Sequence, residues 1–389
     1  RERVQSVKMD AGRAGSLAQR TELESSIGGE KPDLMRIADV DVRRQIQKRC
    51  ADDDLAPVFS TSVERETWLV QLRRSRIECA IDRGVISANG QSAPISEVEL
   101  ELKSGPAAQL FRLADRLNRI VPLRVEPASK AARGYALARD TGLSAPTAAL
   151  VHIDPAMSVR DAFAAILQPC VTHVLASANF ASTRDDPEGI HQLRVAIRRM
   201  RAAFSIFRSA VQGNHRPALA DELRRLQQKL GAAREWDVLV EETVAGMPGK
   251  LQKQRATEDL IRTAQTKRAE GDKSARAALR NPDYTGILLR LASWGARQFG
   301  PDALAPGKWK ADVLAGPVRG FAAGVIHAYH GKVRKLGRKI RKLDAAELHR
   351  LRIRVKKLRY ATEFFNGIWP SRRTIHYLSA LKGLQQVLG

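Results

Sequence analysis

The feature of this sequence that most restricts its fold is a duplicated amphipathic segment. Residues 191–207 (HQLRVAIRRMRAAFSIF) and 349–365 (HRLRIRVKKLRYATEFF) align at an offset of 158 residues, and the same offset aligns residues 223–231 with 381–389. A constant offset across two separated blocks indicates a duplicated structural unit. We therefore expect two related helical modules whose equivalent helices face a shared ligand.

Each copy predicts a helix with one cationic face and one apolar face. At about 100° per residue, His191, Arg194, Arg198 and Arg201 fall within an arc of roughly 80°, and the apolar positions lie roughly opposite. No Asp or Glu lies between residues 188 and 221, so these like charges repel unless an anion lies against them. The candidate anion-binding residues are His191, Arg194, Arg198, Arg199 and Arg201, with His349, Arg352, Lys356, Lys357 and Arg359 in the second copy.

The two histidines leave two interpretations open. Each begins its copy of the segment, three residues before an arginine. A histidine at a helix start often caps the helix or hydrogen-bonds locally, whereas its place on the cationic face favours a phosphate contact. In the second case protonation near pH 6 tightens anion binding, because a polyanion raises the pKa of imidazole.

The net charge of +24 lies almost entirely on the part of the chain that carries the repeat. Residues 1–150 contain 24 Lys and Arg against 21 Asp and Glu, whereas the remaining residues contain 42 against 21. A field of this sign recruits polyanions such as nucleic acid, inorganic polyphosphate or anionic lipid. Specific nucleic-acid binding is disfavoured, since no helix-turn-helix, zinc-finger or RNP motif is present and aromatic residues make up only 5%.

Nothing in the sequence resembles a membrane anchor or a disulfide framework. We find no signal peptide and no apolar span of 18 residues, and the apolar face opposite the arginines is typical of a protein core. Cys50, Cys79 and Cys170 lack the spacing of a zinc site and fit a reducing cytoplasm. We therefore expect a cytoplasmic protein, associated with polyphosphate granules if polyphosphate is its ligand.

Residues 1–140 predict a β-rich domain. Residues 65–86 predict a hairpin, residues 96–104 a strand, residues 106–120 a helix and residues 122–127 a further short strand. In the strand SEVELELKS, Glu97, Glu99 and Glu101 share one face. Three carboxylates in this arrangement are typical of a solvated sheet face, which spacing alone favours, or of a divalent-metal site.

This part resembles the CYTH family of triphosphate tunnel metalloenzymes, which are antiparallel β-barrels. The segments VKMDAG, QRTELE, CAIDRG, EVELELKSG and SKAARGYAL follow the order of that family. The resemblance implies that Glu97, Glu99 and Glu101 bind Mg²⁺ or Mn²⁺ and that Lys8, Arg20 and Lys130 contact a triphosphate. The E-x-E-x-K strand of the family does not precede Lys8, so we expect an incomplete tunnel-barrel and a chain without catalytic activity; no catalytic residue is assigned.

Residues after 150 predict helices only, including a helix from Pro187 to about Val211 and another over residues 232–246. The motifs HxxRVxxRRxRAxxxxF, LGxxREWDVL, HxxRIxxKKLRY and LxxLQxxLG closely resemble the CHAD family, the conserved-histidine α-helical domain. The resemblance implies two pseudo-symmetric four-helix bundles and a basic channel for inorganic polyphosphate, with no cofactor required there.

The sequence thus predicts an α+β protein of two domains. We expect a CYTH-like domain over residues 1–140, a linker over 141–158 and a CHAD-like domain over 159–389, with repeats at about 159–246 and 309–389. The expected function is inorganic polyphosphate binding. The alternative is a metal-dependent inorganic triphosphatase whose helical module recruits polyphosphate. Oligomeric state and chain-length preference are not predicted.

Overall fold

The computed structural model describes residues 3–14, 17–49, 55–140, 144–210, 215–231, 236, 255–299 and 311–388. Side chains are described for these residues except 10–14, 17–20, 209, 215–218, 297–299 and 311. The chain divides into two compact units. The first is mainly Arg1–Leu113 and Ala128–Ser144, and the second is Ala114–Pro127, Ala145–Gln298 and Ala303–Gly389.

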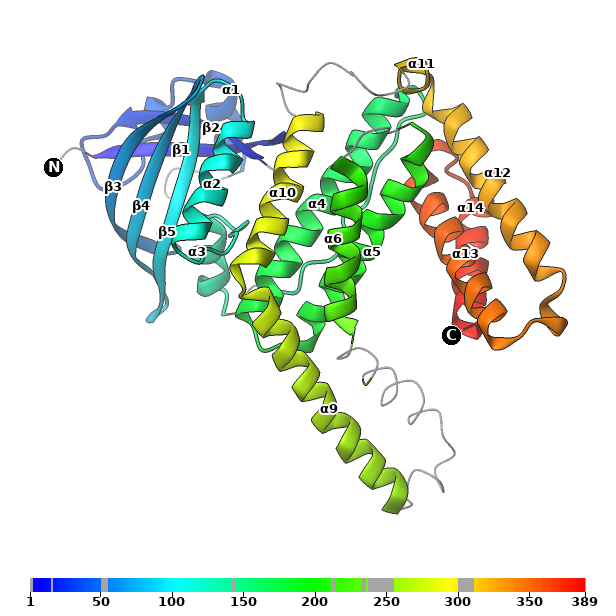
Figure 1. Cartoon of the computed structure of the whole chain (residues 1–389). Helices are drawn as coiled ribbons and strands as arrows, with labels where there is room; N and C mark the ends of the chain where they lie inside the picture. The colour runs from blue at the N-terminus through cyan, green and yellow to red at the C-terminus, as the bar shows by residue number, and fades with distance from the viewer. Residues whose placement is uncertain are drawn as a thin grey trace. The chain divides into compact units, whose positions relative to one another are not determined.

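The first unit is built on two antiparallel sheets, as predicted. One sheet pairs β1 (Val4–Ala14) with β2 (Leu17–Ser26). The other, which is visibly curved in Figure 1, has the order β3 (Ser60–Leu72), β4 (Ser75–Ala88), β5 (Gln91–Ser104). Helices α1 (Val40–Gln47), α2 (Ala108–Ile120) and α3 (Lys130–Ala138) accompany them; α2 extends into the second unit.

The turn between β4 and β5 fixes the register of the larger sheet. Asn89 and Gly90 both have positive φ, at 48° and 76°. A two-residue Asn-Gly turn of this kind matches the twist of the strands that it joins. The resulting ladder places Asp82 of β4 opposite Glu97 of β5.

Helix α3 packs against the sheet through its second half. Ser129 caps it by accepting a hydrogen bond of 3.1 Å from the Ala132 N–H. Gly134 allows the close approach, because a Cβ at that position would overlap the ring of Phe59. The neighbouring Tyr135 packs edge-on against the same ring, with centroids 5.1 Å apart. This packing positions the first turn of α3 over the carboxylates of β4 and β5.

The short strand predicted at residues 122–127 is absent from the structure, which describes this segment as irregular. Its backbone groups bond to side chains instead of a strand. The Leu123 N–H donates to Asn118 Oδ1 at 3.1 Å, and its carbonyl accepts from Thr285 Oγ1 at 2.6 Å. The alternating apolar pattern therefore belongs to an irregular segment that side chains of α2 and α10 hold in place by hydrogen bonds.

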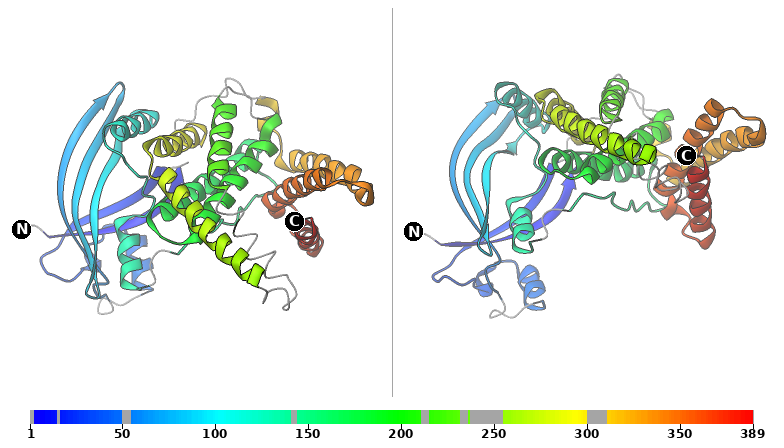
Figure 2. Two further views of the ribbon diagram at one scale, coloured as in Figure 1. Left: turned by 60° about the horizontal axis from the view of Figure 1, so that its bottom comes forward. Right: turned by 90° about the horizontal axis from the view of Figure 1, so that it is seen from below.

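The second unit contains helices and no strand among its described residues, which confirms the predicted change of class after residue 150. Figures 1 and 2 show α12 and α13 running side by side. The helices are α4 (Val159–Thr183), α5 (Pro187–Ile206), α6 (His215–Lys229), α9 (Arg255–Leu279), α10 (Pro282–Phe299), α11 (Ala311–Ala315), α12 (Val318–Gly337), α13 (Ala345–Phe364) and α14 (Arg372–Val387). The helix predicted at 232–246 lies outside the described residues, apart from residue 236.

The duplication is visible in how α5 and α13 begin. Both helices span 20 residues, and each is capped by an aspartate, Asp186 or Asp344, that accepts backbone N–H groups. The preceding helices are joined reciprocally. The Val159 N–H donates to the Gly316 carbonyl at 2.9 Å, and the Val318 N–H donates to the Met157 carbonyl at 3.0 Å.

Four phenylalanines from the two repeats share one core. The ring of Phe207 lies 4.6 Å from Phe163, 5.1 Å from Phe321 and 6.0 Å from Phe365, measured between centroids. Phe163 corresponds to Phe321, and Phe207 to Phe365, at the 158-residue offset. Phe207 and Phe365 are fully buried, so equivalent side chains of both repeats fill a single apolar space.

Helix α4 is the most apolar helix of the second unit and continues through Pro169. Among the described residues it alone is long and apolar enough to cross a membrane, with a mean hydropathy of 1.2 in its best window. However, 67% of that window is buried inside the protein. This corrects the expectation that no stretch resembles a membrane span, and the burial is that of a core helix.

Candidate functional site

The cationic faces of α5 and α13 meet in one cluster. Lys356 of α13 lies half-buried near arginines of both helices. Its burial, and then the charges of these arginines, lower the pKa of its ammonium group to about 8. We call these residues the two-helix cation cluster: Lys356, Arg352 and Arg359 of α13, with Arg194 and Arg198 of α5. Each repeat therefore contributes cations to the same region.

A buried tyrosine holds arginines of both helices. Arg198 Nε of α5 donates a hydrogen bond of 2.7 Å to the hydroxyl of Tyr360 on α13. The guanidinium of Arg359 lies 4.7 Å from the centroid of the same ring. Because Tyr360 is only 3% exposed, its hydroxyl is fixed, and the two guanidinium groups are positioned relative to each other.

Equivalent glutamines orient equivalent arginines in the two repeats. Arg201 Nη1 donates to Gln227 Oε1 at 2.5 Å, and Arg359 Nε donates to Gln385 Oε1 at 3.1 Å. The 158-residue offset relates both members of these pairs. A glutamine oxygen orients a guanidinium without adding a negative charge, although Arg359 also pairs with Glu363.

The cluster contains cations that no carboxylate neutralises within the described residues. Arg198, Arg352 and Lys356 form no ion pair there. Arg352 Nε is in addition buried and has no hydrogen-bond partner in that part of the chain. Burying charge beside like charge is unfavourable, so this arrangement is typical of a site that an anion completes.

Three cations of the predicted set are not members of the cluster, namely Arg199, Arg201 and Lys357. Arg199 is 3.8 Å from a carboxylate oxygen of Glu363 and stacks over the ring of Phe364 at 5.1 Å. Lys357, its equivalent in the second repeat, is exposed. Glu363 also pairs with Arg359 and so offsets positive charge at this edge of the cluster.

The histidines do not cap their helices, since Asp186 and Asp344 do so. His191 is half-buried on α5, and His349 is exposed on α13. Arg194, one turn after His191, donates hydrogen bonds of 2.6 and 3.2 Å to backbone carbonyls at the end of α6. A phosphate contact of either histidine stays a prediction.

A second candidate site lies on the larger sheet of the first unit. Carboxylate oxygens of Asp82, Glu97 and Glu99 all lie within 4.8 Å of one another. Asp82 is fully buried, Glu97 is half-buried and Glu99 is exposed. Several hard oxygen donors on a rigid sheet fit a cation such as Mg²⁺ or Mn²⁺.

Lys130 of α3 places its ammonium group among these carboxylates. Its Nζ lies 2.6 Å from Asp82, 2.5 Å from Glu97 and 2.7 Å from Glu99. Burial alone lowers the pKa of Lys130, but hydrogen bonds to the three carboxylates outweigh it and raise that pKa. Arg133, on the next turn, bonds to Glu97 at 2.5 Å. The carboxylates thus already surround one cation, which is direct evidence that their geometry suits a positive charge.

Arg65 of β3 is the main partner of Asp82. It donates two hydrogen bonds to this carboxylate, at 2.7 and 2.6 Å, and a third of 2.6 Å to Glu99. The hydrogen bonding from Arg65, opposed by burial and assisted by Lys130, lowers the pKa of Asp82 to about 2. Asp82 is therefore held as a carboxylate near neutral pH.

The structure does not gather the other predicted residues of this domain at the same place. Glu101 lies further along β5 and pairs with Lys103 at 2.9 Å. Lys8 pairs with Glu22 at 3.1 Å within the β1–β2 hairpin. The Arg20 backbone pairs with Asp10, and its side chain lies outside the described residues. Their roles stay predictions.

Sequence reasoning missed Asp82, Arg65 and Tyr360 as members of these sites. The Asn89–Gly90 turn was the available signal for Asp82, because it sets the register that faces Asp82 toward Glu97. Tyr360 gives no such signal, since only the packing of α13 against α5 brings its hydroxyl to Arg198.

Fold, repeat and site together define a duplicated helical module with a cation cluster, joined to an antiparallel β domain. The CHAD domain model matches residues 165–389, more than half of the chain, so the protein belongs to the CHAD family. The CYTH domain model matches residues 5–135, and both predicted families are thereby confirmed.

Two relatives show what the chain is similar to. The crystal structure of the CHAD domain from the plant Ricinus communis is 31% identical, with a TM-score of 0.55, over 64% of this chain and 79% of that one. An inorganic triphosphatase of Haemophilus influenzae is 46% identical over 83 residues, 21% of this chain. That match spans only 24% of the triphosphatase.

Proposed function

We propose that this protein binds inorganic polyphosphate through the two-helix cation cluster. One observation carries the proposal: arginines from both α5 and α13 surround the half-buried ammonium group of Lys356, whose pKa is lowered by burial and then by their charges. Oxygens of a phosphate chain supply the missing countercharge, and guanidinium groups match them in pairs.

The paired arrangement of the repeats favours a chain-like ligand. The reciprocal bonds at Val159 and Val318 and the shared phenylalanine core fit a pseudo-twofold relation between α5 and α13. A linear polymer of identical units has the same chemistry in both directions, so both repeats can bind it equivalently. Membership of the CHAD family supports the same ligand class.

Duplex DNA is the competing polyanion. The described cluster offers no exposed aromatic ring on which the bases of a single strand could stack, because Tyr360 is buried. Lys356 is half-buried, so its ligand must be narrow enough to reach between the helices. A thin, flexible phosphate chain meets this condition better than a rigid duplex does.

The test is a titration of the full chain with long polyphosphate and with duplex DNA of equal charge, at matched salt. We expect tighter binding of polyphosphate, with an affinity that falls linearly on a logarithmic salt scale. Equal affinities for both polymers would identify a generic cationic surface and reject the proposal.

Variants locate the site. R198E, R352E and K356E together are expected to abolish polyphosphate binding while circular dichroism stays unchanged. The matched control makes the same charge change at exposed cations elsewhere in the second unit, with R160E, R262E and R373E. A loss of affinity that is equal in both triple variants would contradict the assignment.

A second candidate function is metal-dependent hydrolysis of triphosphate in the first unit. The clustered carboxylates Asp82, Glu97 and Glu99 favour it, together with the CYTH match and the partial similarity to an inorganic triphosphatase. These residues would hold Mg²⁺ or Mn²⁺, which neutralises charge on phosphate oxygens. Lys130 and Arg133, which pair with the same carboxylates in this structure, would then turn to phosphate oxygens.

Phosphate release from tripolyphosphate decides this second function. Release that requires Mg²⁺ or Mn²⁺ and disappears in E97Q supports it, with E66Q on β3 as a control for loss of an exposed carboxylate. Absence of release at any metal concentration rejects it for this chain and agrees with an incomplete tunnel.

A further inference from the structure

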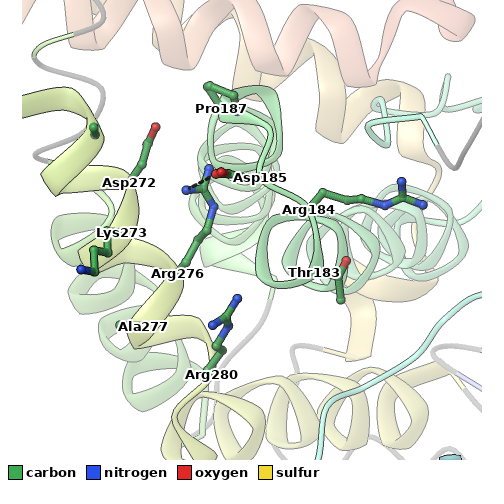
Figure 3. A pocket seen from close by; sticks show the side chains of 10 residues that line it. Thr183, Arg184, Asp185, Pro187, Asp272, Lys273, Arg276, Ala277 and Arg280 are labelled. Carbon is green, nitrogen blue, oxygen red and sulfur yellow. Dashed lines mark ion pairs between the residues drawn. The ribbon is translucent and has the colours of Figure 1, made fainter. Parts of the chain in front are cut away.

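A basic pocket that shares no residue with the two-helix cation cluster lies where α4 passes into α5, against α9 (Figure 3). Its volume is about 630 Å³, a size typical of small-ligand sites. Four of its lining residues are cations: Arg184 of the α4–α5 loop, Lys273 and Arg276 of α9, and Arg280 in the turn that follows α9. Asp185 and Asp272 are the only acids among the ten lining residues, so the wall carries excess positive charge.

Arg276 is the most enclosed cation of this pocket. Its side chain is 14% exposed, and its Nη1 lies 2.7 Å from Asp185 Oδ1. Its Nε is buried without a hydrogen-bond partner among the described residues. A guanidinium offers five N–H donors, so this arginine retains donors for a second oxyanion.

Asp185 is an unusual partner for a buried arginine. Its side chain is 94% exposed, although it reaches the enclosed guanidinium of Arg276. Figure 3 shows the two side chains meeting inside the pocket, with Arg280 directed toward them. The carboxylate therefore occupies the place of an oxyanion while remaining free to swing into solvent.

We propose that this pocket binds a small phosphoryl anion, with Arg276 as the principal ligand and Asp185 as an internal competitor that the anion displaces. The ligand is either free inorganic phosphate or pyrophosphate, or the end of a polyphosphate chain. The ten lining residues include no aromatic ring, so the site selects inorganic phosphate groups over a nucleotide base. The first alternative does not depend on the function proposed for the cation cluster.

The test is calorimetric titration of the full chain with pyrophosphate. D185N removes the internal competitor from an exposed side chain and is expected to tighten binding about fivefold, whereas R276Q weakens it about tenfold. R262Q is the matched control, because Arg262 is an exposed cation of the same helix outside the pocket. Adenosine triphosphate is expected to bind no more tightly than tripolyphosphate.

Unchanged or weaker pyrophosphate binding in D185N overturns the proposal, and this arm holds even where R276Q fails to fold. Binding of pyrophosphate and of long polyphosphate to R198E R352E K356E, which lacks the cation cluster, distinguishes a free anion from the end of a polyphosphate chain. Retained binding of about two proteins per long polyphosphate chain identifies chain ends as the ligand, whereas retained pyrophosphate binding without polyphosphate binding identifies the free anion. The proposal is also overturned if R198E R352E K356E binds neither pyrophosphate nor polyphosphate while R276Q binds both as tightly as the unmodified chain does. All binding then belongs to the cation cluster.

Discussion

Lys356 links the proposed polyphosphate binding to proton uptake. Burial and the surrounding arginines lower the pKa of its ammonium group to about 8, and a bound polyanion reverses the repulsion and raises that pKa. We therefore expect uptake of up to one proton when polyphosphate binds between about pH 8 and pH 9. Calorimetry in two buffers of different ionisation enthalpy measures this uptake.

The substitution K356R is the matched control for this prediction. Arginine keeps the positive charge but does not release its proton in this range. Polyphosphate affinity should therefore persist while the proton uptake disappears. An uptake that is the same in K356R and in the unmodified chain would place the titrating group elsewhere.

Lys356 also affects stability with a definite sign. Its folded pKa lies below the model value of 10.5, so between about pH 8 and pH 10.5 the unfolded chain binds the proton and the folded chain does not. Stability contributed by this residue therefore rises with pH across that interval. Bound polyphosphate removes this rise, because it restores the charged form in the folded state.

Asp82 is expected to contribute to acid unfolding of the first unit. Hydrogen bonding from Arg65 is the largest cause that lowers its pKa, from 3.8 to about 2. The stability that this carboxylate contributes is present above about pH 4 and is lost as the pH falls toward 2. The loss amounts to about 2 kcal/mol at the lower end, since one pKa unit corresponds to about 1.4 kcal/mol.

Urea unfolding of the full chain at a series of pH values measures this contribution. In D82N the free energy of unfolding should fall less between about pH 4 and pH 2, because the contribution of Asp82 is missing. E66Q, which removes an exposed carboxylate of the neighbouring strand, should keep it. The same acid slope in D82N and in the unmodified chain would show that Asp82 does not titrate as described.

At the scale of elements, Phe207 joins the two repeats. It is fully buried and contacts Phe163, Phe321 and Phe365. F207A should destabilise the second unit by about 3–5 kcal/mol, the usual cost of removing a buried aromatic ring. The midpoint of thermal unfolding measures this. A loss below about 1 kcal/mol would show that the shared core contributes little to joining the repeats.

The element boundaries that could be predicted are those with local causes. The span of α5 from Pro187 follows from proline at a first helical position after the cap Asp186. The strand β5 follows from strict alternation of apolar and acidic residues. Residues 122–127 show the same alternation, but the backbone of Leu123 bonds to Asn118 of α2 and to Thr285 of α10. A local pattern contains no information about such partners.

The candidate sites divide in the same way. The cationic faces of α5 and α13 follow from helical periodicity, and the repeat offset pairs Arg198 with Lys356. Helical periodicity placed Arg199 and Lys357 on the cationic faces together with the cluster. It could not predict that Arg199 pairs with Glu363, because Glu363 belongs to α13, a different helix. The sequence pattern also did not predict that Lys130 lies among the carboxylates, because this position depends on how α3 packs on the sheet.

At the scale of the whole molecule, the two proposed functions assign related phosphate ligands to two separate units. The second unit concentrates positive charge in a duplicated helical frame, and the first unit combines carboxylates with cations on a sheet. A protein of this design can hold a long phosphate polymer in one unit while the other binds a short phosphate chain. Each activity has its own residues, so variants in one unit should leave the other function unchanged.

The central claim is that α5 and α13 form one polyphosphate site. The most direct measurement is the stoichiometry and affinity of polyphosphate binding in two variants that change equivalent residues, R194E R198E on α5 and R352E K356E on α13. A shared site predicts that either variant alone loses the high-affinity binding event, by similar factors. If each variant instead keeps half of the binding at the original affinity, the two helices bind independently and the account is wrong.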